Sequence, residues 1–173
     1  MEINKSFSKL ALCTDGSINS MDAIEAGIDL AKRLGASIYI LYVENEKLAD
    51  KKIESDESYA KEAINQVIKS GQEYNLDFNP IILKGDPAEK IIDYSKNNDI
   101  SLIIIGTKGH SGIKKFMLGS VAEKVVRHSS IPVMVVQSKF TQNGIDDKSK
   151  TLPDETLRDE KLREKREHVK FPE

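Results

Sequence analysis

The chain has 173 residues, 31% of them charged, and the charges almost cancel to a formal net charge of −2. This length suits one domain with a sizeable core and is short for two, while the near-neutral charge excludes the basic surface of a nucleic-acid-binding protein. The sequence has one cysteine, no apolar leader and no run near the ~20 apolar residues of a membrane span, which together predict a cytoplasmic protein without membrane contact.

Short strands and amphipathic helices alternate from residue 9 to residue 137. The helix after Ser17 is expected to end at Gly35, which suits a left-handed C-cap. The next begins near Tyr59, carries apolar residues at helical spacing and ends near Gly71. A third helix is capped by Asp86, with a proline at its first position, and a fourth follows a glycine-rich stretch. The predicted strands are residues 9–14, 37–43, 78–84, 102–105 and 131–137.

This alternation of strands and helices implies right-handed crossover connections and an α/β fold, a single five-stranded parallel sheet with helices on both faces. Ligands of such sheets bind outside the carboxyl ends of the strands. Asp15, Val43, Gly85 and Gly106 all fall near those ends. We therefore expect the functional residues along that edge of the sheet.

The most informative stretch lies between the fourth strand and the last helix. The strand stops at Gly106, and Gly109 and Gly119 border a loop before the helical pattern resumes. Ser120 and Glu123 have the spacing of a capping box, so the helix is expected to start at Ser120. Such a loop turns backbone N–H groups toward an anion, and the helix N-terminus adds partial positive charge. The stretch therefore predicts a phosphate site; the alternative is a connection that needs its glycines only for tight turning.

Neither the P-loop string nor the dinucleotide fingerprint Gly-x-Gly-x-x-Gly occurs in the sequence. What occurs is Gly106-x-x-Gly109, nine residues, and then Gly119-Ser120. This spacing resembles the ATP-binding signature of the universal stress protein family, with every signature position matched. The resemblance covers roughly residues 7–138. It includes the opening strand that ends in Thr-Asp-Gly-Ser, the second strand that ends in Val43, a Gly-Asp-Pro turn and the final Ile-Pro-Val-Met-Val-Val.

The resemblance implies strand order 3-2-1-4-5, a Rossmann-like architecture of the adenine nucleotide hydrolase type, and ATP bound along the strand ends with Mg²⁺ or Mn²⁺ held through the phosphates. By position, Val43 would lie against adenine and Asp15 near the ribose or the phosphate-bound cation. Asp15 is equally suited to a turn that bonds its own backbone, and His110 is either beside the anion or an ordinary loop residue. No metal site made of protein groups alone is expected. The expected nucleotide-binding residues are Thr14, Asp15, Val43, Gly106, Gly109, His110, Gly119, Ser120 and Val121.

Catalysis has little support in the sequence. No nucleophile with an adjacent base can be assigned, and the arginines outside the C-terminal tail, Arg33 and Arg127, do not fall in the signature loop. We therefore expect no catalytic residue and at most slow ATP hydrolysis. The first hypothesis is an ATP-binding protein that acts in stress response or signalling through nucleotide occupancy and dimerisation. One alternative is a slow ATPase or an adenylating enzyme of the same architecture; adenylating enzymes have an opening loop Ser-Gly-Gly-x-Asp-Ser, which this sequence does not match. The other alternative is a dimerisation module without a ligand, and the intact glycine signature argues against it.

The fifth strand and the residues after it bear on assembly. The run from Ile131 to Val136 is apolar on both faces, and such a strand is rarely left uncovered at the edge of a sheet, where its backbone groups would be unpaired. We therefore expect a homodimer in which two copies pair through this run. After Gln137 the chain holds 9 basic and 9 acidic residues and few apolar ones. Residues 1–138 are thus expected to form the nucleotide-binding domain and residues 139–173 a charged tail, disordered or partly helical. A tail that covers the fifth strand, or one that binds an unknown protein partner, remains the alternative.

Overall fold

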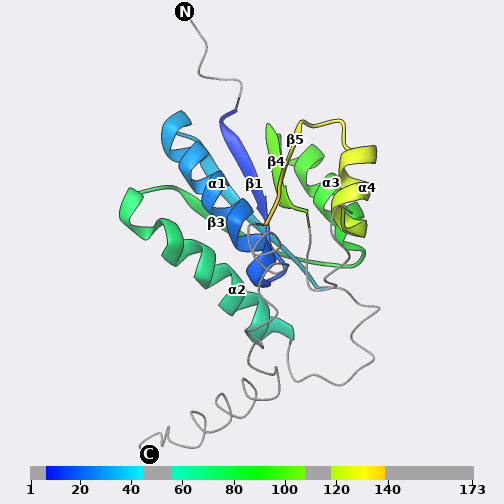
Figure 1. Ribbon diagram of the computed structural model, residues 1–173, viewed down its shortest axis with the longest axis horizontal. Coiled ribbons are helices and arrows are strands. Elements are labelled where there is room, and N and C mark those ends of the chain that lie inside the picture. The colour runs from blue at the N-terminus through cyan, green and yellow to red at the C-terminus, as the bar shows by residue number, and fades with distance from the viewer. Residues whose placement is uncertain (1–6, 45–55, 108–117, 139–173) are drawn as a thin grey trace, which may run out of the picture. The chain divides into compact units, whose positions relative to one another are not determined.

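The computed structural model describes residues 7–44, 56–107 and 118–138, and within them it shows one parallel sheet with helices on both faces (Figure 1). The strand order is β3-β2-β1-β4-β5, which confirms the predicted fold and the order 3-2-1-4-5. The elements are β1 (Lys9–Cys13), α1 (Ile18–Leu34), β2 (Ser37–Glu44), α2 (Asp56–Gly71), the 3₁₀ turn η2 (Gln72–Tyr74), β3 (Phe78–Lys84), α3 (Pro87–Asn97), β4 (Leu102–Gly106), α4 (Ser120–His128) and β5 (Val133–Val136).

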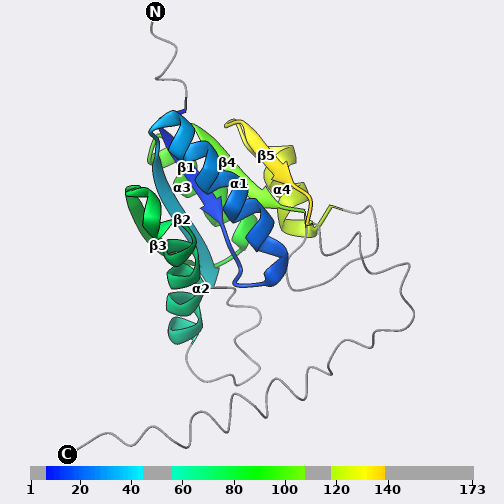
Figure 2. The ribbon, with the colours of Figure 1, turned by 60° about the vertical axis from the view of Figure 1, so that its left-hand side comes forward.

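The sheet separates two hydrophobic clusters. Helices α1 and α2 cover one face and α3 and α4 the other, as the turned view in Figure 2 also shows. The central strand β1 is buried on both sides: Leu10 and Leu12 face α1 and α2, and Ala11 and Cys13 face α3 and α4. Burial raises the pKa of the Cys13 thiol to about 12. The cysteine is therefore a small core residue, in line with its place in an apolar strand.

Helix α1 lies very close to β1, and Gly27 permits that approach. A Cβ atom at Gly27 would overlap Cδ2 of Leu12 and would lie 3.3 Å from Cδ1 of Ile104. Both neighbouring side chains are fully buried. The missing side chain of Gly27 thus sets the distance between helix and sheet.

The start of β1 is attached to the start of β4 by a compact set of hydrogen bonds. The Ser101 hydroxyl accepts from the Lys9 amide at 3.0 Å and donates to the Lys9 carbonyl at 2.8 Å. The Lys9 ammonium donates to the carbonyl of Asn98 at 3.1 Å. These contacts join residues about ninety positions apart and fix the register in which Leu10 pairs with Leu102.

Most helix ends agree with the sequence, while some strand ends differ. Gly35 closes α1 at φ +63°, and Asp86 caps α3 as predicted. The fifth strand begins two residues later than predicted: Ile131 and Pro132 precede it, and the Ile131 amide instead donates to the Ser129 hydroxyl at 3.0 Å. Proline has no N–H to give to a ladder.

No helix in the described ranges has the length and apolar character needed to cross a bilayer. The predicted tail, residues 139–173, lies outside the described residues.

Candidate functional site

The carboxyl ends of β1, β2 and β4 meet at one edge of the sheet, and the described part of the candidate site lies there. The Thr14 amide continues the ladder by donating to the Leu41 carbonyl at 3.0 Å. Thr107, directly after β4, donates its amide to the Val136 carbonyl at 2.9 Å. These bonds hold the first residue beyond β1 and the first residue beyond β4 in line with the sheet.

The turn after β1 is organised by its own side chains. The Asp15 Oδ1 atom accepts from the Ser17 amide at 3.0 Å and from the Ser17 hydroxyl at 2.6 Å. Gly16 has φ +78°, and its amide donates to the Thr14 hydroxyl at 3.1 Å. Since the Ser20 hydroxyl donates to the Ser17 carbonyl, the Thr14 hydroxyl donates to Ser20. Asp15 thus bonds the backbone of its own turn, which was one of the two interpretations of this residue from the sequence. The Thr14 hydroxyl stabilises the same turn.

The end of β4 and the start of α4 are joined directly. The Gly119 amide donates to the Thr107 carbonyl at 2.7 Å. The first i→i−4 bond of α4 runs from the Glu123 amide to the Gly119 carbonyl at 2.8 Å. The amides of Ser120 and Val121 precede that bond and have no helical partner. The structure therefore places Gly106, Gly119, Ser120 and Val121 close together, at a helix start that carries partial positive charge.

The capping box predicted for α4 is wrong, although the helix does begin at Ser120. Gly119 is the N-cap, and in the described residues no side chain completes the cap. Ser120 is the first helical residue and is exposed. The Glu123 carboxylate pairs with Arg127 at 2.9 Å, one turn along the helix. Glu123 thus stabilises the surface of α4, and the Ser120 hydroxyl is left on the outside of the helix start.

Val43 and Val121 come to the same side of the sheet. Both are partly buried and pack against the cluster that contains Ile105 and Ala122. An apolar side chain from β2 and another from α4 thus flank the strand ends. Gly109 and His110, the remaining predicted site residues, lie outside the described residues.

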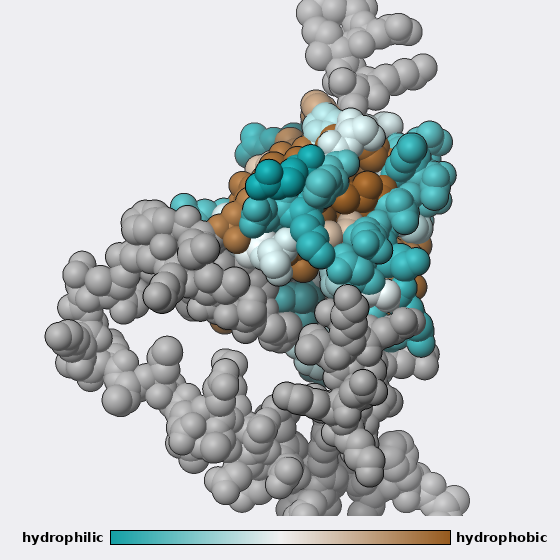
Figure 3. Space-filling view, turned by 90° about the vertical axis from the view of Figure 1, so that its right-hand side faces the viewer, coloured by the Kyte–Doolittle hydropathy of each residue, from teal (hydrophilic) through white to brown (hydrophobic). Residues whose placement is uncertain are grey.

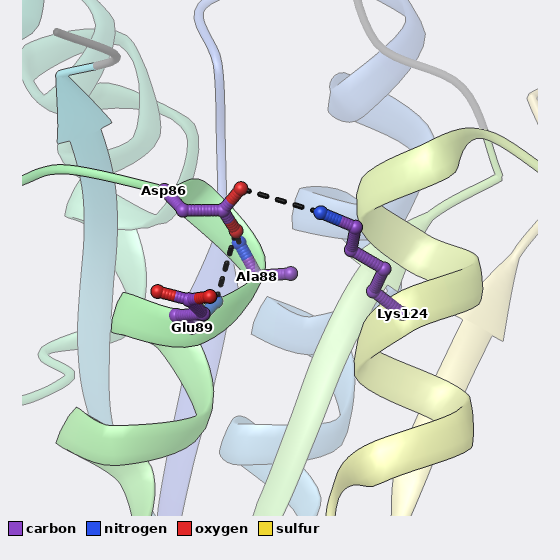
Figure 4. Close-up of polar contacts among 4 residues, drawn as sticks. All are labelled: Asp86, Ala88, Glu89 and Lys124. Carbon is purple, nitrogen blue, oxygen red and sulfur yellow. Dashed lines mark hydrogen bonds and ion pairs between the residues drawn. The ribbon is translucent and has the colours of Figure 1, made fainter.

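A second helix start, that of α3, borders the same edge. The Asp86 Oδ1 atom accepts from the amides of Ala88 and Glu89, and its Oδ2 atom lies 3.3 Å from the Lys124 ammonium of α4 (Figure 4). Burial acts to raise the pKa of Asp86, but the hydrogen bonds from Glu89, Lys124 and Ala88 outweigh it and hold the pKa below its ordinary value. The charged Asp86 therefore links α3 to α4 beside the candidate site.

Two residues at this edge, Thr107 and Tyr59, were not predicted from the sequence to lie at the site. The Thr107 hydroxyl is buried and has no hydrogen-bond partner in the described residues; its only sequence signal is its place directly after Gly106. Tyr59 of α2 reaches Gly16, since a Cβ atom there would lie 2.9 Å from the Tyr59 Oη atom. Sequence periodicity placed Tyr59 only at a helix start. Across the described ranges, no cluster of three or more histidine, cysteine or acidic residues is arranged to hold a metal ion.

The model of the universal stress protein family matches residues 6–137 of the chain. The chain belongs to this family. Among its relatives is universal stress protein YxiE of Bacillus subtilis, 33% identical over 147 residues, with 76% of this chain and 99% of the relative covered. Universal stress protein MJ0531 of Methanocaldococcus jannaschii is 31% identical over 140 residues, with 76% of this chain and 82% of the relative covered.

Solved structures of other family members have the same fold. Protein MJ0577 of M. jannaschii superposes with a TM-score of 0.63 at 26% identity, over 78% of this chain and 98% of that one. A universal stress protein in complex with cAMP has a TM-score of 0.60 at 20% identity, over 76% of this chain and 97% of that one. A universal stress protein of Archaeoglobus fulgidus in complex with dAMP has a TM-score of 0.59 at 18% identity, over 75% and 96%.

Proposed function

We propose that this universal stress protein binds an adenine nucleotide at the carboxyl edge of its sheet and acts in cytoplasmic stress response or signalling through nucleotide occupancy. ATP is the proposed ligand, with Mg²⁺ or Mn²⁺ held through its phosphates. Val43 contacts the adenine, Asp15 lies near the ribose or the cation, and the glycines at the end of β4 and the start of α4 receive the phosphates. In this proposal Gly109, His110 and Val121 complete the phosphate side, and Thr14 shapes the turn that carries Asp15.

The observation that carries the proposal is the Gly119–Thr107 hydrogen bond of 2.7 Å, which joins the end of β4 to the start of α4. It brings the start of α4, which has no side-chain cap in the described residues, next to the end of β4 at Gly106. A helix N-terminus beside a glycine-rich strand end binds phosphate in many α/β proteins. Two family members whose structures hold cAMP and dAMP support adenine as the base. Because no catalytic base or arginine is assigned at the phosphates, we propose that hydrolysis is slow, below about one turnover per minute.

Titration calorimetry with Mg²⁺ and ATP tests the site. The wild type is expected to bind in the micromolar range, about −8 kcal/mol at 1 μM. In Gly119→Val a branched side chain meets the phosphates, and we expect binding to be lost. Gly119 has φ −63° and ψ 153°, a conformation that valine adopts readily, so the variant is expected to fold.

Ser130→Val is the matched control, because it adds the same side chain at an exposed position beyond the other end of α4. Equal affinities of wild type and Gly119→Val would contradict the site. Mass analysis of the nucleotide released from the purified protein on denaturation identifies it as ATP, AMP or a cyclic nucleotide. A phosphate-release assay with several turnovers per second would contradict the slow hydrolysis.

We propose further that two copies pair through the strand β5 within the run from Ile131 to Val136. In the described residues β5 pairs only with β4, on one of its edges. Met134 and Val135 point to opposite faces and are each 37% exposed, and Val126 of α4 is 46% exposed. Figure 3 shows apolar surface among hydrophilic side chains on the side of the molecule that carries α4 and β5. Antiparallel pairing of two such edges around a two-fold axis covers this surface.

Sedimentation velocity of the full chain and of a chain ending at Ser138 tests the pairing. Dimers in both, and a monomer in Val135→Glu, are expected; Asn65→Glu, which adds the same charge on the exposed side of α2, is expected to stay dimeric. A full-length monomer that associates only when the tail is removed would show that the tail covers β5 and would contradict the proposal.

A further inference from the structure

Tyr59, in the first turn of α2, lies over the β1–α1 turn. A Cβ atom at Gly16 would lie 2.9 Å from both the Cε1 and the Oη atom of Tyr59. The tyrosine ring therefore occupies the volume that a side chain at position 16 would need. The ring also meets Tyr42 of β2 edge-on, with centroids 6.3 Å apart. Tyr59 nevertheless remains 42% exposed. Its ring is thus held by two strand ends while one side stays open to solvent or to a ligand.

The phenol stands in the electrostatic field of Asp15. Burial, the charge of Asp15 and the charge of Glu62 all raise the pKa of Tyr59. The hydroxyl is therefore protonated at neutral pH, the form in which a phenol can donate a hydrogen bond. The Asp15 carboxylate already accepts two hydrogen bonds from Ser17, at 3.0 and 2.6 Å. The Asp15 carboxylate is thus hydrogen-bonded by Ser17, and its charge acts on the Tyr59 phenol of α2.

We propose that Tyr59 is a positioning residue of the nucleotide site, which keeps the Asp15–Gly16 turn closed against α2 so that Asp15 is aimed at the nucleotide before it binds. The inference rests on the proposed function, because Asp15 is the residue assigned there to the ribose or the cation. Gly16 at φ +78° gives the turn a shape that residues with side chains rarely adopt, and the tyrosine occupies the space the glycine leaves. A carboxylate fixed in advance loses less conformational freedom on binding, so affinity rises without a new ligand contact.

The first experiment needs no ligand. The chain has 5 tyrosines, so the phenol resonance of Tyr59 in ¹³C-tyrosine-labelled protein is assigned by its loss in Tyr59→Phe. Its titration is then compared between wild type and Asp15→Asn. We expect the pKa of Tyr59 to fall in Asp15→Asn, because one of the charges that raise it is gone. An unchanged titration would overturn the proposal, since Tyr59 would then not sense Asp15.

The second experiment measures ATP binding with Mg²⁺ in wild type, Tyr59→Phe, Asp15→Asn and the double variant. Tyr59→Phe keeps the ring and is expected to weaken binding about fivefold, in the range of one hydrogen bond. The double variant is expected to bind as Asp15→Asn does, because a residue that acts through Asp15 has no effect once that carboxylate is gone. Tyr74→Phe is the matched control: Tyr74 is 37% exposed and its ring lies over Lys32, 4.0 Å from the ammonium.

The outcomes separate the two proposals. If Tyr59→Phe binds as wild type while Asp15→Asn is weakened, the nucleotide site stands and the role of Tyr59 is overturned. The role of Tyr59 would also be overturned if the fold-losses of ATP affinity in Tyr59→Phe and Asp15→Asn multiplied in the double variant. Independent losses would mean that Tyr59 contacts the nucleotide itself and does not act through Asp15. If wild type and Tyr74→Phe bind no adenine nucleotide at all, the proposed function fails, and with it the positioning role.

Discussion

Replacing Gly27 with alanine measures how closely α1 lies against β1. Two opposing effects set the result. Alanine is favoured over glycine inside a helix by about 1 kcal/mol. The new Cβ overlaps Cδ2 of Leu12, however, and Leu12 and Ile104 are fully buried, so neither side chain has space to retreat into. Overpacking of this kind costs about 1–3 kcal/mol. We therefore expect a net loss of stability of up to about 2 kcal/mol.

The sign of this effect is expected to reverse when Leu12 is shortened. Leu12→Ala alone costs about 2–5 kcal/mol because it leaves a cavity. In that background the methyl group that Gly27→Ala introduces enters the vacated space, and the substitution should stabilise the protein by about 1 kcal/mol, the helix preference of alanine over glycine. Urea unfolding of the four proteins, followed by far-UV circular dichroism, gives the cycle of free energies.

Glu25→Ala is the control, because it changes an exposed residue of the same helix and should alter stability by no more than about 0.5 kcal/mol. A gain of stability in Gly27→Ala alone, or the same sign in both backgrounds, would refute the close contact between α1 and β1.

Further results are expected from changes at single residues. Asp86→Ala removes the cap of α3 and should cost about 1–2 kcal/mol in urea unfolding at pH 7; Lys124→Ala, at a side chain 56% exposed, should cost less than about 1 kcal/mol. Folding lowers the pKa of Asp86, so the contribution of this carboxylate to folding stability is present above the ordinary aspartate pKa and is lost as the pH falls through the lowered value. Asp86→Ala should therefore lose less stability on acidification than the wild type does. Ser95→Ala should raise stability by up to about 1 kcal/mol, because the Ser95 hydroxyl is fully buried without a hydrogen-bond partner in the described residues; a clear loss would show that the hydroxyl is bonded. With its thiol pKa raised to about 12, Cys13 should resist a thiol reagent at pH 8 in the folded protein and react at once in urea, and fast reaction of the native protein would place it at the surface.

Features that depend on neighbouring residues were predictable from the sequence. The left-handed glycine at the end of α1 and the cap of α3 involve residues a few positions apart, so local preferences decide them. The cap of α4 was mispredicted because Glu123 has two local options, a return to the cap or a pair with Arg127, and the sequence alone does not rank them. The contact of Tyr59 with Gly16 could not be foreseen, since it depends on how α2 packs across the sheet.

The hydrogen bonds between Ser101 and Lys9 have a consequence for synthesis of the chain. They span 92 residues, so β1 leaves the ribosome long before the strand that closes its second edge. At about 5–20 residues per second the interval is roughly 5–18 s. Pairing with β2 protects one edge of β1 in that time, while the other keeps its backbone groups unpaired between two apolar faces. Such an edge is a template for other chains, so we expect polypeptides that stop before Leu102 to aggregate on release.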